Sequence, residues 1–127
     1  MSKPRISVVV CTFNRADILP YCLNSLAEQS LHKNLYEVII VNNNSTDQTQ
    51  QIAEQFAVNQ PNFRFVTESN QGHSHARNRG WQEARGEYVA YIDDDAKAES
   101  DWCEEILEAF EKITPKPVAV GGEIRPW

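Results

Sequence analysis

Three consecutive aspartates, Asp93, Asp94 and Asp95, are the residues of this chain best suited to chemistry. In an extended segment the first and third point to the same side, because side chains alternate with period two. Two like charges about 4 Å apart cost roughly 1 kcal/mol in water and about 4 kcal/mol near a protein surface. A cation would relieve that repulsion, and carboxylate ligands suit a hard ion, Mg²⁺ or Mn²⁺. A solvated acidic turn is the alternative interpretation.

Polar residues also follow three other short apolar runs. The run 6–11 leads into Thr12-Phe13-Asn14-Arg15, the run 36–41 into Asn42-Asn43-Asn44, and the run 63–66 into a polar stretch over 68–78. The aspartates follow the run 88–92. In an open parallel sheet the ligand crevice lies beyond the carboxyl ends of the strands. We therefore expect the four clusters to converge on one edge of a sheet and to form a binding site there.

The basic residues near these clusters divide into two groups. Arg15 and Arg77 are candidate contacts for an anion or a base, because a planar guanidinium can stack and can donate two bonds. Arg77 faces the crevice if the helix that carries it begins near His75. Arg79 is expected to make a surface ion pair, and His73 and His75 are expected to be loop or cap residues rather than metal ligands.

Two alternating patterns predict the elements that position these residues. Runs rich in β-branched residues predict strands at 6–11, 36–41, 63–66, 88–92 and 118–120. Apolar stripes at helical spacing separate them, and they place helices around 19–26, 52–56, 76–84 and 103–110. This alternation predicts an α/β fold with a mostly parallel sheet and helices on both faces.

Local signals refine the helix ends and the core. Ser45 and Gln48 fit a capping box at the start of the second helix. Gly86 stands where a left-handed residue would end the third helix, and prolines at 115 and 117 would stop the fourth. Helical spacing indicates that three aromatic residues lie in the core or half-buried: Tyr21, Trp81 and Trp102.

Composition bounds the class of protein. The chain has 127 residues, of which 41% are hydrophobic, so we expect one soluble domain over 1–127. Its net charge of −6 argues against generic nucleic-acid binding, which relies on Lys and Arg. No apolar run approaches the ~20 residues of a membrane span. The 3 cysteines form no CxxC pair and are expected to be reduced thiols in a cytoplasmic protein, with peripheral attachment to the inner membrane face left open.

Several common site motifs are absent from the sequence. There is no GxxxxGK[ST] loop, no GxGxxG after the first strand and no GxSxG elbow. These absences argue against a P-loop enzyme, a dinucleotide-binding Rossmann enzyme and an acyl hydrolase. A phospho-receiver domain would need acidic residues after the first strand, where Cys11-Thr12-Phe13-Asn14 offers none.

Four segments together resemble the family 2 glycosyltransferases. They are ISVVVCTFNR from residue 6, VIIVNNNSTD from residue 38, NQG with ARNRG from residues 70 and 76, and YIDDD from residue 91. They occur in the family's order and spacing and cover nearly the whole chain. The resemblance implies a Rossmann-like GT-A fold, a nucleotide-diphosphate sugar donor linked to UDP or dTDP, and a divalent metal, Mg²⁺ or Mn²⁺.

The resemblance also assigns residues to the donor. It places Asn42 where the family usually has an aspartate that contacts the base. It makes Asp95 the main metal ligand, bridging to the diphosphate, with Asp93 near the ribose or the metal. The full set that it implies for nucleotide-sugar binding is Thr12, Asn14, Arg15, Asn42, Asn44, Arg77, Asp93 and Asp94.

The expected reaction is transfer of the sugar to a hydroxyl of a carbohydrate or lipid-linked acceptor, in polysaccharide or glycoconjugate synthesis. Inversion at the anomeric carbon is expected because the family that the chain resembles inverts. The family's acceptor half lies beyond the end of this chain, so we expect the donor-binding half, truncated after the fifth strand. The catalytic base stays unassigned, because Glu123 is conceivable but is more simply a solvated residue. A nucleotidyltransferase and a non-catalytic nucleotide-binding fragment are the alternatives.

Overall fold

Strands and helices alternate along the part of the chain that the computed structural model describes, residues 3–112. The strands are β1 (Ile6–Thr12), β2 (Tyr36–Asn42), β3 (Phe63–Thr67) and β4 (Tyr88–Asp93). The helices are α1 (Leu19–Ala27), α2 (Thr49–Asn59), α3 (His73–Glu83) and α4 (Trp102–Lys112). The prediction of an α/β chain is confirmed. The predicted strand at 118–120 and the prolines at 115 and 117 lie outside the described residues.

The four strands form one parallel sheet in the order β3-β2-β1-β4. Cys11 of β1 pairs in register with Val41 of β2 and with Asp93 of β4. Asn42, the last residue of β2, pairs with Thr67 of β3. The carboxyl ends of all four strands therefore meet at one edge, as the polar clusters predicted.

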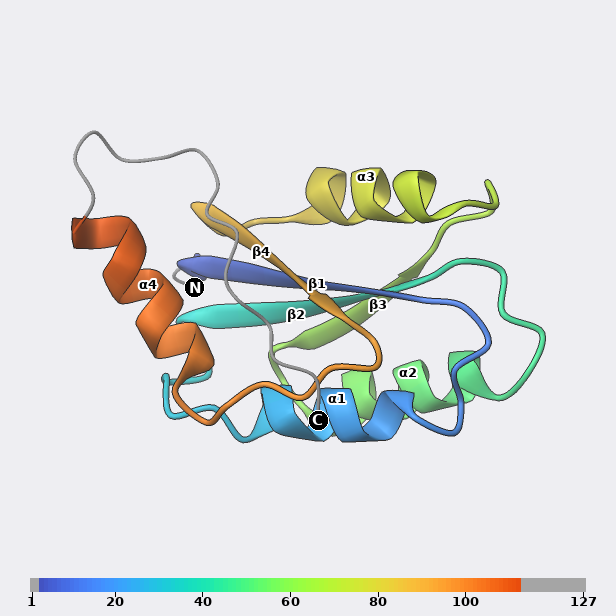
Figure 1. Ribbon diagram of the computed structural model, residues 1–127, viewed down its shortest axis with the longest axis horizontal. Coiled ribbons are helices and arrows are strands. Elements are labelled where there is room, and N and C mark those ends of the chain that lie inside the picture. Colours follow the sequence, from blue (N-terminus) through green and yellow to red (C-terminus); the bar gives the residue numbers. More distant parts are fainter. Residues whose placement is uncertain (1–2, 113–127) are drawn as a thin grey trace.

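Helices cover both faces of this sheet (Figure 1). On one face, alternate residues of β1 such as Val8 and Val10 belong to a buried cluster with α1, α2 and α4. On the other face, Val9 and Ile39 pack with Ala76 of α3 in a smaller cluster. Every residue of β2 is buried, as expected for a strand covered on both sides. The predicted two-sided arrangement is confirmed.

Two glycines let the chain approach β1 closely. A Cβ at Gly80 of α3 would lie 2.3 Å from Cγ1 of Val9, so α3 packs against the sheet at a position that only glycine allows. A Cβ at Gly86 would lie 2.8 Å from the backbone nitrogen of Ser7. The predicted role of Gly86 as a left-handed helix terminus is wrong, because α3 already ends at Glu83 and the one glycine with a positive φ in the described chain is Gly72.

The predicted capping box is also wrong. α2 begins at Thr49, and the Asp47 carboxylate accepts its backbone N–H at 2.9 Å. Ser45 faces the loop after β1 instead, where its hydroxyl accepts the backbone N–H of Asn14 at 2.9 Å. Ser45 therefore ties two loops together, and Asp47 bonds the start of the helix in its place.

The aromatic residues depart from prediction in two of three cases. Trp102 packs half-buried against the larger core cluster, as predicted. Tyr21 and Trp81 are 58% and 55% exposed, so placing them in the core was wrong. Each lies at helical spacing from apolar neighbours, but on the outer side of its helix.

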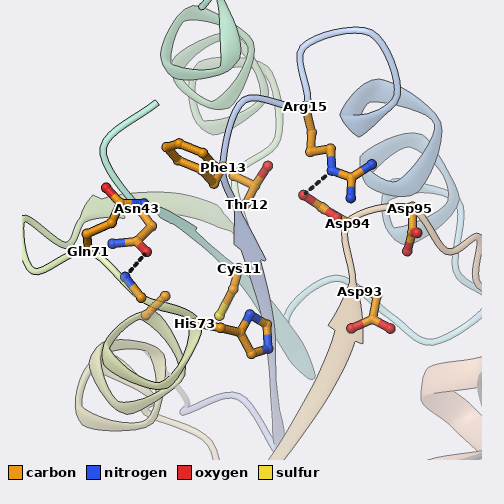
Figure 2. Close-up of a pocket in the computed structure, with 12 residues that line it drawn as sticks. Cys11, Thr12, Phe13, Arg15, Asn43, Gln71, His73, Asp93, Asp94 and Asp95 are labelled. Atoms are coloured by element: carbon orange, nitrogen blue, oxygen red, sulfur yellow. Dashed lines mark hydrogen bonds and ion pairs between the residues drawn. The ribbon is translucent and has the colours of Figure 1, made fainter. Parts of the chain in front are cut away.

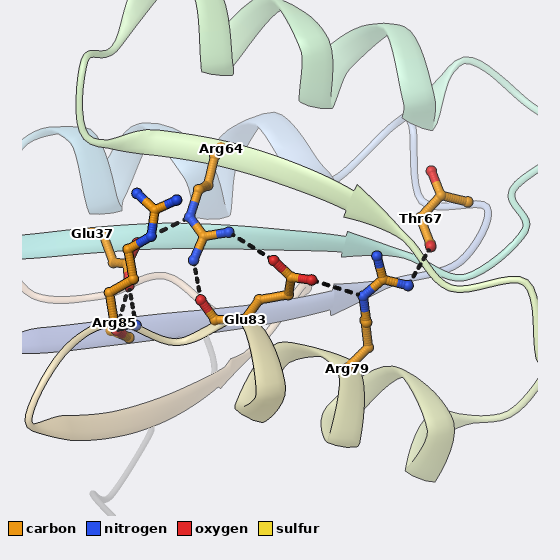
Figure 3. A network of polar contacts seen from close by, with 7 residues as sticks. Glu37, Arg64, Thr67, Arg79, Glu83 and Arg85 are labelled. Atoms are coloured by element: carbon orange, nitrogen blue, oxygen red, sulfur yellow. Dashed lines mark hydrogen bonds and ion pairs between the residues drawn. The ribbon is translucent and has the colours of Figure 1, made fainter.

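A buried carboxylate organises the sheet face beneath α3 (Figure 3). Glu37 of β2 is 6% exposed. It accepts hydrogen bonds from the Ser7 hydroxyl at 2.5 Å, the Arg64 guanidinium at 3.1 Å and the Arg85 backbone N–H at 2.8 Å. Arg64 also bonds Glu83, the last residue of α3, through its carboxylate and its backbone carbonyl. A buried charge needs such partners, and here they fix the end of α3 to β2 and β3.

Within residues 3–112, no helix combines the length and the apolar character that crossing a bilayer requires.

Candidate functional site

A cleft of about 410 Å³ lies at the edge where the strands end (Figure 2). Residues from the ends of β1, β2 and β4 and from the start of α3 form its walls. The lining residues are Cys11, Thr12, Phe13, Arg15, Asn43, Gln71, Gly72, His73, Ala76, Asp93, Asp94 and Asp95. This is the place that the strand-end argument predicted.

The end of β1 forms the middle of the cleft. Thr12 is 3% exposed, and its hydroxyl has no hydrogen-bond partner within the described chain. Phe13 beside it is 46% exposed, so an aromatic face is open to a ligand. Burial raises the pKa of the Cys11 thiol to about 11, which keeps it neutral near pH 7. A buried hydroxyl without a partner is costly, and a ligand in the cleft would satisfy it.

The three aspartates form the wall on the β4 side. Figure 2 shows Asp94 pointing towards Arg15, while Asp93 and Asp95 point away from that pair. The Arg15 Nε lies 3.9 Å from Oδ2 of Asp94, whose side chain is 13% exposed. Burial raises the pKa of the Asp94 carboxyl, and the Thr12 hydroxyl and Arg15 guanidinium oppose that rise. The Thr12 hydroxyl lies beside this carboxylate without reaching hydrogen-bond geometry. Asp93 and Asp95 are exposed at the cleft. The predicted alternation within the triplet is therefore present.

A metal ion at this wall would need ligands from a bound molecule as well as from the protein. No group of three or more His, Cys, Asp or Glu side chains within residues 3–112 is arranged to hold a metal ion. Mg²⁺ and Mn²⁺ commonly use one or two protein carboxylates and take their other ligands from water and phosphate oxygens. Asp93 and Asp95 can supply such carboxylates. His73 lines the cleft and is the first residue of α3, next to Gly72 at the N-cap.

Asn43 forms the opposite wall with the loop before α3. Its side-chain NH₂ donates to the carbonyls of Glu68 and Asn70, each at 2.9 Å. Its side-chain oxygen accepts the backbone N–H of Gly72 at 2.9 Å. Asn43 is 4% exposed, and its amide bonds fix the position of Gln71 and Gly72 at the cleft.

Two of the predicted nucleotide contacts lie outside the lining of the cleft and bond neighbouring loops. The Asn42 side-chain oxygen accepts the backbone N–H of Ser45 at 3.1 Å, and its NH₂ donates to Gln50 at 2.5 Å. Asn14 has a φ of 50°, and its side-chain oxygen accepts the backbone N–H of Thr46 at 2.7 Å. Both ends of the Asn42 amide and the side-chain oxygen of Asn14 are thereby engaged within the protein.

Asn44 and Arg77 also lie outside the lining. The Asn44 NH₂ donates to the carbonyl of Ser69 at 2.6 Å. The Arg77 guanidinium carbon lies 4.6 Å from the centre of the Tyr91 ring, in a cation–π contact on the exposed side of α3. The helix begins at His73, earlier than the start near His75 on which the expectation that Arg77 faces the crevice depended.

Sequence reasoning placed Thr12, Arg15 and the three aspartates, and the structure brings all five to one cleft. The sequence reasoning did not select seven further residues that line the cleft, although most of them follow directly on a strand end or lie at the start of α3. Those residues are Cys11, Phe13, Asn43, Gln71, Gly72, His73 and Ala76.

Comparison with known proteins decides the family. The family model described as Glycosyl transferase family 2 matches residues 7–126. The chain belongs to glycosyl transferase family 2. A family 2 relative, the glucosyl-dolichyl phosphate glucuronosyltransferase of Haloferax volcanii, is 32% identical over 124 residues, which cover 96% of this chain and 39% of the relative.

Solved family 2 structures share the fold. TarS of S. aureus, residues 1–349 in complex with UDP-GlcNAc, is 30% identical with a TM-score of 0.77, over 84% of this chain and 32% of TarS. The mannosyltransferase PcManGT of Pyrobaculum calidifontis, in complex with GDP-Man and Mn²⁺, is 32% identical with a TM-score of 0.69, over 76% of this chain and 29% of that structure. The fold is GT-A, and the chain spans about a third of the length of these relatives.

Proposed function

We propose that this chain binds a nucleotide-diphosphate sugar, linked to UDP or dTDP, as the donor of a glycosyl transfer. One observation carries the proposal: the unpartnered, buried Thr12 hydroxyl and the Asp93–Asp95 carboxylates face one cleft at the carboxyl ends of parallel strands. A hydroxyl without a partner suits a ligand that brings acceptor oxygens, and a diphosphate brings several. Family 2 membership and the nucleotide sugars in the two neighbouring structures support this choice.

Asp93 and Asp95 are the residues that would hold a divalent cation, Mg²⁺ or Mn²⁺. When bound, the cation supplies positive charge against the negative charge that develops on the departing diphosphate. The Mn²⁺ in the PcManGT structure supports the choice of metal. Arg15, with its side chain 49% exposed beside the cleft, adds a fixed positive charge on the same wall.

The proposed reaction is a displacement at the anomeric carbon. The acceptor hydroxyl oxygen forms the new glycosidic bond, the bond to the diphosphate breaks, and the diphosphate leaves with the electron pair. A base takes the hydroxyl proton. We propose inversion and a carbohydrate or lipid-linked acceptor from the resemblance, and we propose that residues 1–127 form the donor-binding half of one GT-A domain.

A second candidate is a nucleotide-binding module without transfer activity of its own. The lining of the cleft favours this second candidate. The carboxylates that line the cleft all lie on the proposed metal side, where they are not placed to act as the base. A nucleotidyltransferase is a weaker candidate, because Thr12-Phe13-Asn14-Arg15 lacks the Gly-rich basic phosphate loop that such enzymes usually carry after the first strand. Hydrolysis of the donor sugar by this chain would separate a transferase from a binding module.

Calorimetry with UDP, dTDP and GDP, with and without Mn²⁺, tests the proposal. We expect UDP or dTDP to bind in a Mn²⁺-dependent way. Asp95→Asn should weaken that binding at least tenfold, about 1.4 kcal/mol. The matched control is Asp17→Asn, an exposed aspartate outside the cleft lining, which should leave binding unchanged. The proposal fails if no nucleoside diphosphate binds with Mn²⁺ present and Asp95→Asn has no effect.

A further inference from the structure

Two consecutive asparagines hold the loop that forms the wall opposite the aspartates. Asn43 donates to the carbonyls of Glu68 and Asn70, and Asn44 donates to the carbonyl of Ser69 between them. Three successive carbonyls of one loop are thus bonded by two neighbouring side chains at the end of β2. We call Asn43 and Asn44 the amide clamp.

Only an amide can make the bonds of Asn43. It donates twice and also accepts the backbone N–H of Gly72, so both ends of its amide are used. An ionised aspartate accepts only and would place a negative charge against two carbonyl oxygens. Asn43 is 4% exposed, so water cannot easily replace the lost bonds.

The same loop is held from the side of α3. The Arg79 guanidinium donates to the Thr67 carbonyl at 3.1 Å (Figure 3). It also lies 3.7 Å from the Glu68 carboxylate. Arg79 also forms an ion pair with Glu83 at 3.1 Å, which confirms the ion pair predicted for it. Gly72, at the end of the loop, has a φ of 135°, a conformation that other residues rarely adopt. The loop is therefore fixed at both ends and along its length.

We propose that the amide clamp positions the Gln71–Gly72 wall for the nucleoside of the donor, an inference that rests on the proposed function. β2 and β4 flank β1 on opposite sides, so the clamp and Asp93–Asp95 lie at opposite ends of the cleft. Figure 2 shows Asn43 and Gln71 on one side of Thr12 and the aspartates on the other. With the diphosphate at the carboxylates, the nucleoside extends towards the wall that the clamp holds. Asn43 and Asn44 are positioning residues rather than catalytic ones.

Asn43→Asp tests this inference, because it is nearly isosteric, replaces the donating NH₂ with an acceptor oxygen and places a negative charge against the loop carbonyls. Binding of UDP and of inorganic diphosphate, each with Mn²⁺, is measured by calorimetry, with thermal unfolding followed in parallel. We expect UDP to bind at least tenfold more weakly and diphosphate to change less than twofold. The matched control is Asn62→Asp, which removes an amide donated to the Tyr36 carbonyl at the far end of the sheet and should alter neither affinity.

The split between the two ligands distinguishes positioning from general loss of structure. Equal weakening of UDP and diphosphate, or unchanged binding of both, overturns the inference. If Asn43→Asp does not fold, Asn44→Asp removes the bond to the Ser69 carbonyl and the long bond to the Gln71 side chain, and it should weaken UDP selectively by a smaller factor. If the unmodified chain binds diphosphate with Mn²⁺ but binds none of the nucleotides, the proposed function fails instead of the clamp.

Discussion

Thr12→Val should make the free protein more stable and the ligand complex weaker. Valine replaces the hydroxyl of threonine with a methyl group at almost the same volume. In the free protein that hydroxyl is buried, at a position that is 3% exposed, and it makes no full hydrogen bond even to its polar neighbour Asp94. Leaving such a group unsatisfied costs about 1–3 kcal/mol, so its removal returns part of that cost. The two effects have opposite signs, which a general packing defect would not produce.

The expected magnitudes follow from this burial. We expect the free energy of unfolding to rise by about 1 kcal/mol, which corresponds to a melting temperature roughly 3–5 °C higher for a domain of this size. A hydrogen bond to a charged phosphate contributes about 1.5–3 kcal/mol. Its loss should weaken binding of the nucleoside diphosphate roughly 10- to 100-fold, at about 1.4 kcal/mol for each factor of ten.

Calorimetric unfolding and nucleotide titration measure both effects on one sample. Thr49→Val is the matched control, because the Thr49 hydroxyl is fully buried but donates to Asp47 at 2.5 Å and accepts the Arg15 backbone N–H at 3.0 Å. The same substitution there should lower the melting temperature. A lower melting temperature for Thr12→Val with unchanged binding would refute the reasoning, since it would mean that the Thr12 hydroxyl is already satisfied within the protein.

Three further predictions concern the walls and the packing of the fold. Burial raises the pKa of the Cys11 thiol to about 11, so roughly one thiol in a thousand is ionised at pH 8. Cys11 should therefore react slowly with maleimide at pH 8, and its reaction rate should rise as the pH approaches 11. A fast reaction at pH 8 contradicts this prediction. Gly80→Ala should lower the free energy of unfolding in urea by about 1–2 kcal/mol, because the new Cβ would meet the Val9 side chain. In a Val9→Ala background the same change should be neutral or stabilising. Strictly additive effects of the two substitutions would contradict this prediction. Arg64→Ala should lower the free energy of unfolding by about 3 kcal/mol, because it leaves the buried Glu37 carboxylate without its cation, and a loss below about 0.5 kcal/mol would show that Glu37 does not depend on that pair.

The sequence was sufficient to predict the sheet and the edge that carries the site. β-branched runs such as 36–41 are buried on both faces, so their apolar character is continuous and a strand is easy to recognise. Parallel strands bring their carboxyl ends together whatever their order. For that reason Thr12, Arg15 and Asp93 could be assigned to one site before their spatial positions were known.

Side-chain direction within the loops could not be predicted in the same way. Asn42, Asn43 and Asn44 are identical in type and adjacent in sequence, yet only Asn43 lines the cleft. The φ of 65° at Asn44 turns the backbone there. The partners of Asn43 and Asn44 lie on a loop distant in sequence, whereas Asn42 bonds Ser45 and Gln50 close by. Tyr21 shows the same limit on a helix, because helical spacing does not say which side faces the sheet when the apolar stripe is broad.

A crystal structure of this chain grown with Mn²⁺ and UDP tests the central claim most directly. The account predicts a metal ion bound to Asp93 or Asp95, diphosphate oxygens on that ion, the Thr12 hydroxyl donating to the ligand, and the nucleoside against the Gln71–Gly72 wall. Clear density for UDP at another surface, with the aspartates facing bulk solvent, would contradict the account.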